Sequence, residues 1–150
     1  MKLQFVRFGK FKSHPCQELF DHYLKLTKKF ISIDYLILSE KPSLEKAFEK
    51  FLEQKKSAFY LTILDEKGKI FTNQSFALEV EKLQTQGIKE WVILCSGAYG
   101  LSLSSKKKAK LLWSLSPMVM THELAAVIAM EQLFRTFSIL NNHPYHHEGS

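Results

Sequence analysis

Cysteine is scarce in this chain, and no long hydrophobic run is present. The two cysteines, Cys16 and Cys95, stand far apart without the spacing of metal ligands, which excludes a disulfide-rich scaffold and predicts free thiols in a reducing cytoplasm. The most apolar stretch, residues 124–130, falls well short of the roughly 20 residues that span a membrane. Residues 1–7 also lack the apolar core of a signal peptide. We therefore expect a cytoplasmic protein without a membrane partner.

Glycine and proline are sparse as well, at 6 and 4 of 150 residues, and no stretch has the composition of a linker. The length predicts a single domain over residues 1–150. The glycines do not fall at G-x-G-x-x-G spacing, and no glycine-rich loop ends in the lysine of a P-loop. A cradle for phosphate groups is therefore disfavoured, which counts against a small doubly wound domain that binds another nucleotide.

Positive charge is what the chain has in excess. Lysine and arginine outnumber aspartate and glutamate by 21 to 15, which gives a formal charge of +6, and lysines cluster at residues 25–29 and 106–108. Such an excess attracts polyanions, nucleic acid above all, although lysines also solvate ordinary helix surfaces. The charge favours a nucleic-acid partner without establishing one.

Apolar segments alternate with amphipathic ones along the chain. Strands that alternate with helices, some of them apolar throughout, pack as a parallel sheet between two helix layers. The predicted fold class is therefore α/β, with a mainly parallel sheet and helices on both faces. A turn over residues 65–69 is predicted to close the third strand. The predicted strands cover residues 2–8, 31–38, 58–64, 91–95 and 111–115, and the predicted helices begin at Pro15 and at 42–43 and cover about 75–86, 104–110 and 122–140.

Three loops are expected to meet at one edge of that sheet, because ligands of parallel sheets bind beyond the carboxyl ends of the strands. They begin at Leu64, Ser96 and Ser116. In the second loop, the glycines within residues 96–100 would let backbone amides approach a ligand, or would simply form a tight turn. The third loop, residues 116–120, is either a buried connection or the floor for a flat uncharged group such as adenine.

The carboxyl-terminal tail gathers side chains that take part in chemistry. His143, Tyr145, His146 and His147 fall within five positions. Histidine titrates near neutral pH and tyrosine stacks on bases, so the tail favours proton transfer or contact with nucleic acid. No acidic or cysteine partner stands at ligand spacing, and no metal site is predicted.

These segments together resemble a known family, the ribosomal RNA large subunit methyltransferase H family, within the SPOUT (α/β-knot) class. The resemblance covers nearly the whole chain. It implies a trefoil-knotted carboxyl-terminal half, a homodimer, and S-adenosylmethionine held in the knot. The implied reaction is methylation of large-subunit ribosomal RNA, free or in the assembled ribosome, at N3 of a pseudouridine. The motifs that carry it lie at residues 64–69, 96–101, 115–118, 122, 131–135 and 143–146.

Carried over residue by residue, the resemblance also implies a site. Tyr145 and His146 would be catalytic and would face the target nucleotide near the partner subunit's cofactor. His122, Arg135 and His143 would contact the substrate. The implied cofactor-binding residues are Leu64, Ser96, Gly97, Gly100, Leu115, Ser116, Pro117, Met118, Val119 and Met120.

Two positions depart from the family pattern. Ser96 stands where the family usually has a glycine, and Ala126 stands where it usually has an arginine, four residues after the histidine that corresponds to His122. Arginine could organise the pocket or hold RNA, whereas alanine can do neither. The alternative prediction is therefore a dimeric RNA-binding or ribosome-associated module that kept the fold and lost turnover.

Overall fold

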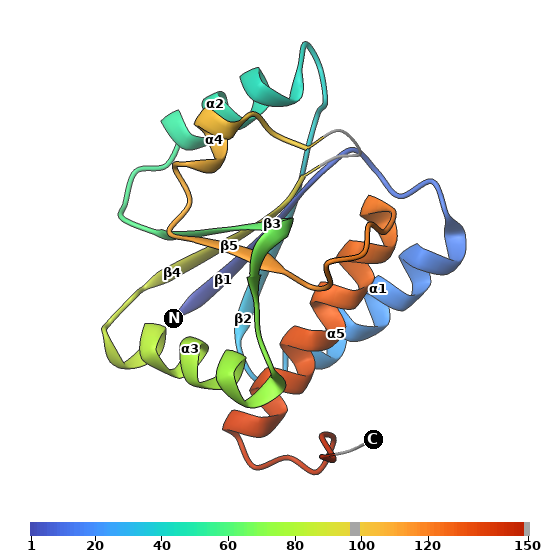
Figure 1. Cartoon of the computed structure of the whole chain (residues 1–150), viewed down its shortest axis with the longest axis vertical. Helices are drawn as coiled ribbons and strands as arrows, with labels where there is room; N and C mark the ends of the chain where they lie inside the picture. The colour runs from blue at the N-terminus through green and yellow to red at the C-terminus, as the bar shows by residue number, and fades with distance from the viewer. Residues whose placement is uncertain (97–99, 149–150) are drawn as a thin grey trace.

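The computed structural model describes residues 1–96 and 100–148, and its strands lie side by side in one sheet (Figure 1). Within these residues the strands are β1 (Lys2–Phe8), β2 (Ser32–Leu38), β3 (Tyr60–Ile70), β4 (Glu90–Cys95) and β5 (Leu111–Ser114). Their order across the sheet is β2-β1-β4-β3-β5, and every neighbouring pair is parallel. The predicted α/β fold class with a parallel sheet is therefore confirmed.

Helices cover both faces of the sheet (Figure 1). They are α1 (His14–Thr27), α2 (Leu44–Glu53), α3 (Asn73–Thr85), α4 (Leu103–Lys106) and α5 (His122–Leu140). Helices α1, α3 and α5 lie on one face, and α2 and α4 lie on the other. Because side chains alternate along a strand, Leu3 and Phe5 of β1 enter the first core, while Val6 and Phe8 enter the second.

A hydroxyl side chain precedes each of these helices and explains where it begins. In every case the oxygen of this residue accepts a hydrogen bond from a backbone N–H of the first turn, a group that has no partner within the helix. The helix starts predicted from the sequence agree with these starts within two residues. The capping residues are Ser13, Ser43, Thr72, Ser102 and Thr121.

The turn predicted over residues 65–69 is wrong, because the chain continues there as part of β3. Leu64 and Lys69 both pair with Trp113 of β5, so the residues between them leave the ladder as a bulge. Glycine at position 68 allows β3 to pass close to the backbone of β5. A Cβ atom at Gly68 would lie 2.5 Å from the carbonyl oxygen of Leu112, closer than real contacts allow.

The helix predicted over residues 104–110 is also shorter than expected and ends at Lys106. The following residues turn toward the sheet, and the backbone N–H of Lys110 donates to the carbonyl oxygen of Leu61 at 2.8 Å. Hydrogen bonding to β3 therefore begins at Lys110, one residue before β5, so the helix cannot extend to this residue.

Helix α5 is the most buried helix, and it packs between α1 and α3. Its apolar residues reach around much of its circumference, from Ala126 to Phe137. Among the described residues, no helix is long and apolar enough to cross a membrane. The knot implied by the resemblance stays a prediction.

We expect Gly68→Ala to lower the free energy of unfolding by about 1–3 kcal/mol, the usual cost of overpacking, because the new methyl group would press on the backbone of β5. Urea unfolding measures this. Lys67→Ala is the matched control, since Lys67 is exposed in the same bulge and its substitution should change stability by less than about 0.5 kcal/mol. Equal effects of the two substitutions would contradict the steric explanation.

Candidate functional site

A cavity of about 950 Å³ opens beside the bulge of β3, where β4 and β5 end and where α5 begins. Residues of all three predicted loops line it. Pro117 is exposed and is not part of the lining, and Gly97 lies outside the described residues. The predicted cofactor-binding residues that line the cavity are Leu64, Ser96, Gly100, Leu115, Ser116, Met118, Val119 and Met120.

The apolar loop after β5 is held by its two serines. The Ser114 hydroxyl lies 3.0 Å from the carbonyl oxygens of both Glu66 and Ser116, and so joins the bulge of β3 to this loop. The Ser116 hydroxyl accepts from the N–H of Met118 at 3.0 Å. Met118 and Val119 are 77% and 78% exposed, which excludes the reading of this loop as a buried connection.

Asp65 and Lys106 form an ion pair at 2.9 Å on the wall of the cavity. Burial by itself would raise the pKa of Asp65. The hydrogen bond from the N–H of Lys67 and the ammonium group of Lys106 outweigh burial and hold this pKa below its ordinary value. Asp65 therefore remains a carboxylate and ties α4 to the bulge of β3.

Glu123, in the first turn of α5, fixes the opposite wall. Its carboxylate accepts from the N–H of Lys12 at 3.1 Å and from the N–H of Ser13 at 2.9 Å. Burial raises the pKa of Glu123, but these two bonds, together with the charges of Arg7 and His122, bring it below its ordinary value. The start of α1 is thereby fastened to the start of α5.

Several cavity residues were missed by the sequence prediction. Ser13 caps α1 and Cys16 lies in its first turn, remote in the chain from the three predicted loops, and Cys95 is the last residue of β4. Burial raises the pKa of Cys95 to about 11, so this group remains a thiol at neutral pH. Its sulfur lies 3.6 Å from the carbonyl oxygen of His122, a predicted substrate residue that also lines the cavity.

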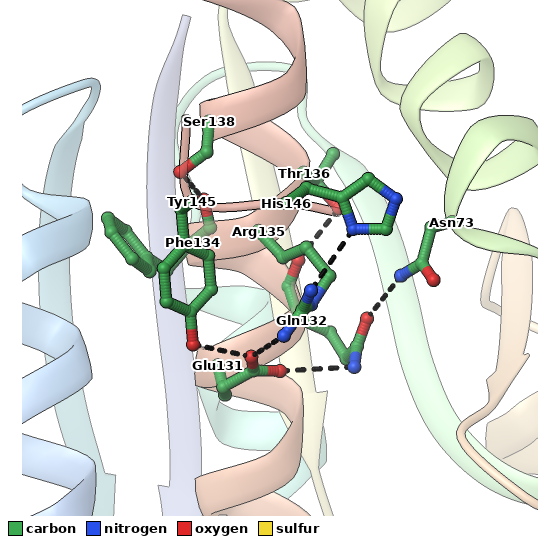
Figure 2. Close-up of polar contacts among 9 residues, drawn as sticks. All are labelled: Asn73, Glu131, Gln132, Phe134, Arg135, Thr136, Ser138, Tyr145 and His146. Carbon is green, nitrogen blue, oxygen red and sulfur yellow. Dashed lines mark hydrogen bonds and ion pairs between the residues drawn. The ribbon is translucent and has the colours of Figure 1, made fainter. Parts of the chain in front are cut away.

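A second polar group lies toward the other end of α5 (Figure 2). Glu131 and Arg135, one helical turn apart, form an ion pair at 2.7 Å. The tail folds back onto them. The Tyr145 hydroxyl donates to Glu131 at 2.9 Å, and Nδ1 of His146 lies 3.0 Å from Nη1 of Arg135. We call these four residues the tail cluster; its member Glu131 was not assigned a role from the sequence.

The contacts of His146 determine its tautomer. Arginine only donates, so Nδ1 of His146 must accept from Arg135. Nε2 then carries the proton and donates to Glu148 at 3.0 Å. His146 is thus neutral in this arrangement, and its basic lone pair points at a guanidinium group.

Tyr145 has the opposite character. Burial, its hydrogen bond to Glu131 and its contact with Tyr23 all raise the pKa of its hydroxyl group well above the ordinary value. Tyr145 therefore stays protonated and donates a hydrogen bond, which counts against its predicted use as a base.

The remaining predicted substrate residue, His143, lies beside the tail cluster. Its backbone N–H donates to Ser138, and its ring meets the rings of Phe30 and Phe134 edge-on at 5.7 and 6.1 Å between centroids. These contacts position the turn between α5 and the tail.

The tail cluster does not reach the cavity of its own chain. Glu131 stands nine residues beyond His122 on the same helix, and Arg135 stands thirteen residues beyond it. At 1.5 Å per residue these separations are about 14 and 20 Å. The structure thus divides the predicted site into two places.

Comparison with known proteins shows the family. The family described as "Predicted SPOUT methyltransferase" matches residues 1–146. This chain belongs to the SPOUT methyltransferase family, as the resemblance predicted.

Relatives bear a more particular name. The chain is 35% identical to ribosomal RNA large subunit methyltransferase H of Flavobacterium johnsoniae, over 99% of this chain and 100% of that protein. It is 32% identical to the protein of the same name from Acholeplasma laidlawii, over 97% and 99% of the two chains. The crystal structure of a probable methyltransferase from Bordetella pertussis has a TM-score of 0.54 at 10% identity, covers 91% of this chain and 94% of its own, and shows the fold alone.

Because the folded protein lowers the pKa values of Asp65 and Glu123, its free energy of unfolding should depend on pH in the acidic range. Asp65 and Glu123 contribute stability that is present above the ordinary carboxyl pKa and is lost as the pH falls through their lower folded values. We expect the free energy of unfolding to fall below about pH 4. Asp65→Asn should reduce this dependence, as measured by urea unfolding between pH 7 and 3.

Asp34→Asn is the control for this measurement, because Asp34 forms a half-exposed ion pair with Lys2 that should contribute little. A wild-type dependence on pH in the Asp65→Asn protein would refute the role given to the pair of Asp65 and Lys106.

Proposed function

We propose that this protein transfers a methyl group from S-adenosylmethionine to large-subunit ribosomal RNA, at N3 of a pseudouridine. The observation that carries the proposal is the cavity at the bulge of β3 and the carboxyl ends of β4 and β5, in a chain of a methyltransferase family whose similar members are named for this RNA. The formal charge of +6 suits an RNA partner.

The cavity residues fit the proposed cofactor. The volume of about 950 Å³ is at the upper end of that for a small-molecule site. The apolar loop of Met118, Val119 and Met120 provides a surface for a flat ring. Glu123, which accepts hydrogen bonds from backbone N–H groups, supplies negative charge that suits a sulfonium or ammonium group, whereas Lys106 balances the charge of Asp65. S-adenosylmethionine, when bound, supplies an activated methyl group.

The tail cluster is proposed to receive the target nucleotide. N3 of the base must lose its proton, and His146 has a lone pair at Nδ1 that becomes available once Arg135 turns to an RNA phosphate. Tyr145, which stays protonated, would donate a hydrogen bond to the base or stack on it. Glu131 positions Tyr145 and Arg135.

A homodimer would bring the two places together. Apolar side chains continue from the cavity loop onto the outer side of α5, where Leu124 and Ile128 are 45% and 36% exposed. Exposed apolar patches of this kind mark contact surfaces. Since the tail cluster lies far from its own cavity, each active site would combine the cavity of one subunit with the tail of its partner.

The retired RNA-binding module is the second candidate, favoured by the departures at Ser96 and Ala126. Ser96 lines the cavity, and Ala126 is fully buried on the inner side of α5. Such a module would bind RNA without binding the cofactor or transferring methyl groups.

Calorimetric titration with S-adenosylmethionine separates these candidates. We expect saturable micromolar binding at one site per chain, and at least tenfold weaker binding to Ser116→Trp, whose indole would fill the cavity. A folded wild-type protein that binds RNA but no cofactor would support the retired module.

His146→Ala should lower methyl transfer to large-subunit RNA by about a hundredfold or more, the usual contribution of a general base. Its affinity for S-adenosylmethionine should stay within threefold of wild type, since His146 lies outside the cavity. The exposed His22→Ala is the matched control and should transfer at the wild-type rate.

Mixed dimers test how the site is assembled. A dimer of one Ser116→Trp subunit and one His146→Ala subunit holds one intact cavity and one intact tail on different chains. If the site is shared between subunits, this dimer regains up to half of the wild-type activity. Inactive mixed dimers would place cavity and tail of one site on the same chain.

A further inference from the structure

Arg7, the sixth residue of β1, is a buried cation. It is 1% exposed, its Nη1 donates to the Tyr35 hydroxyl at 3.1 Å, and its guanidinium carbon lies 3.7 Å from the ring centroid of Phe11. Within residues 1–96 and 100–148 no carboxylate forms an ion pair with it, and its Nη2 has no hydrogen-bond partner.

Such a group is costly. A buried charge without a directly paired counter-charge loses its hydration, and an apolar side chain of the same volume usually serves stability at least as well. Core packing therefore does not explain why Arg7 stands here, whereas a role at the neighbouring cavity would.

The position of Arg7 supplies that reason. Arg7 is in register with Cys95, and the side chains of both strands alternate, so Arg7 and Cys95 leave the same face of the sheet. Cys95 lines the cavity. Arg7 thus lies on β1, directly beside Cys95 on β4, at the usual spacing of about 4.8 Å between neighbouring strands.

The contact of Arg7 with Phe11 connects it to the cavity wall that contains Glu123. Phe11 directly precedes Lys12 and Ser13, whose N–H groups donate to Glu123. Ser13 also caps α1, because its hydroxyl accepts from the N–H of Cys16 at 3.3 Å. A guanidinium stacked on Phe11 therefore fixes the segment that carries this wall.

Charge acts in the same direction. Burial raises the pKa of Glu123, and the positive charge of Arg7 acts with the two backbone hydrogen bonds of Glu123 to lower it and keep the carboxyl group ionised. An ionised Glu123 is the acceptor that the N–H groups of Lys12 and Ser13 require.

We propose that Arg7 is a positioning residue of the cofactor cavity, which holds the segment from Phe11 to Ser13 and the carboxylate of Glu123 in place from the neighbouring strand β1, on the face of the sheet that α1 and α5 cover. The inference rests on the proposed function, because it takes the cavity to be the site of S-adenosylmethionine.

The test compares Arg7→Met, Arg7→Lys and Phe11→Leu with wild type by calorimetric titration with S-adenosylmethionine. We expect Arg7→Met and Phe11→Leu to weaken binding by about tenfold to a hundredfold, the loss that follows when a binding group moves by about an ångström. Arg7→Lys keeps the charge but loses the planar fork, and should lie between them and wild type. Phe11→Leu leaves β1 intact and covers the case in which Arg7→Met does not fold.

Amide hydrogen exchange distinguishes a local effect of Arg7 on the segment at Ser13 from a general loss of stability. In Arg7→Met, the amides of Lys12 and Ser13 should exchange faster while those of β1 and β4 keep their protection. Lys2→Met, which removes a cation at the other end of β1, is the matched control and should match wild type in both measurements.

Wild-type affinity in all three variants, or faster exchange spread evenly over the chain, would overturn the role of Arg7 and leave the proposed function standing. A wild-type protein without measurable affinity for S-adenosylmethionine would instead refute the proposed function and this inference with it.

Discussion

The burial of α5 against the sheet is the constraint on which both the cavity and the tail cluster depend. Large apolar side chains such as Met130, Leu133 and Phe137 each stabilise the fold by about 1.5–3 kcal/mol when they leave water. The buried hydroxyl groups of Thr136 and Ser138 donate to carbonyl oxygens of the same helix, at 2.7 and 2.8 Å, and so cost little. With its axis fixed in this way, α5 presents its first turn to the cavity and its last turns to the tail.

The same packing explains why the two places stay apart. An α-helix is a rigid spacer, and the tail turns back only as far as Glu131 and Arg135. The pairing of Tyr145 with Glu131 and of His146 with Arg135 keeps the tail ordered on its own chain. In a shared site, RNA would compete for the groups that these contacts now occupy.

The buried positive charge beside the cavity is that of Arg7 on β1, a strand that holds none of the site residues predicted from the sequence. Ala126, on the buried side of α5, carries no charge, whereas Arg7 brings a buried guanidinium group from β1. In the role proposed for Arg7, the cation beside the cavity thus comes from β1 and not from α5. Relative to glycine, Ser96 adds a small hydroxymethyl side chain at a position that lines the cavity.

The sequence by itself determined the fold class, the helix starts and two of the three predicted loops that line the cavity. These follow from local signals, such as apolar strands and amphipathic helix patterns, and they need no knowledge of distant contacts. Only the tertiary structure decided that β3 continues past Leu64, because the close approach of Gly68 to β5 is a contact between strands. It likewise brought Ser13 and Glu123 together from positions 110 residues apart, and it fixed the protonation of Tyr145 and His146 through their neighbours. Pairings of this kind depend on where the packed elements meet, and no local pattern in the chain records that.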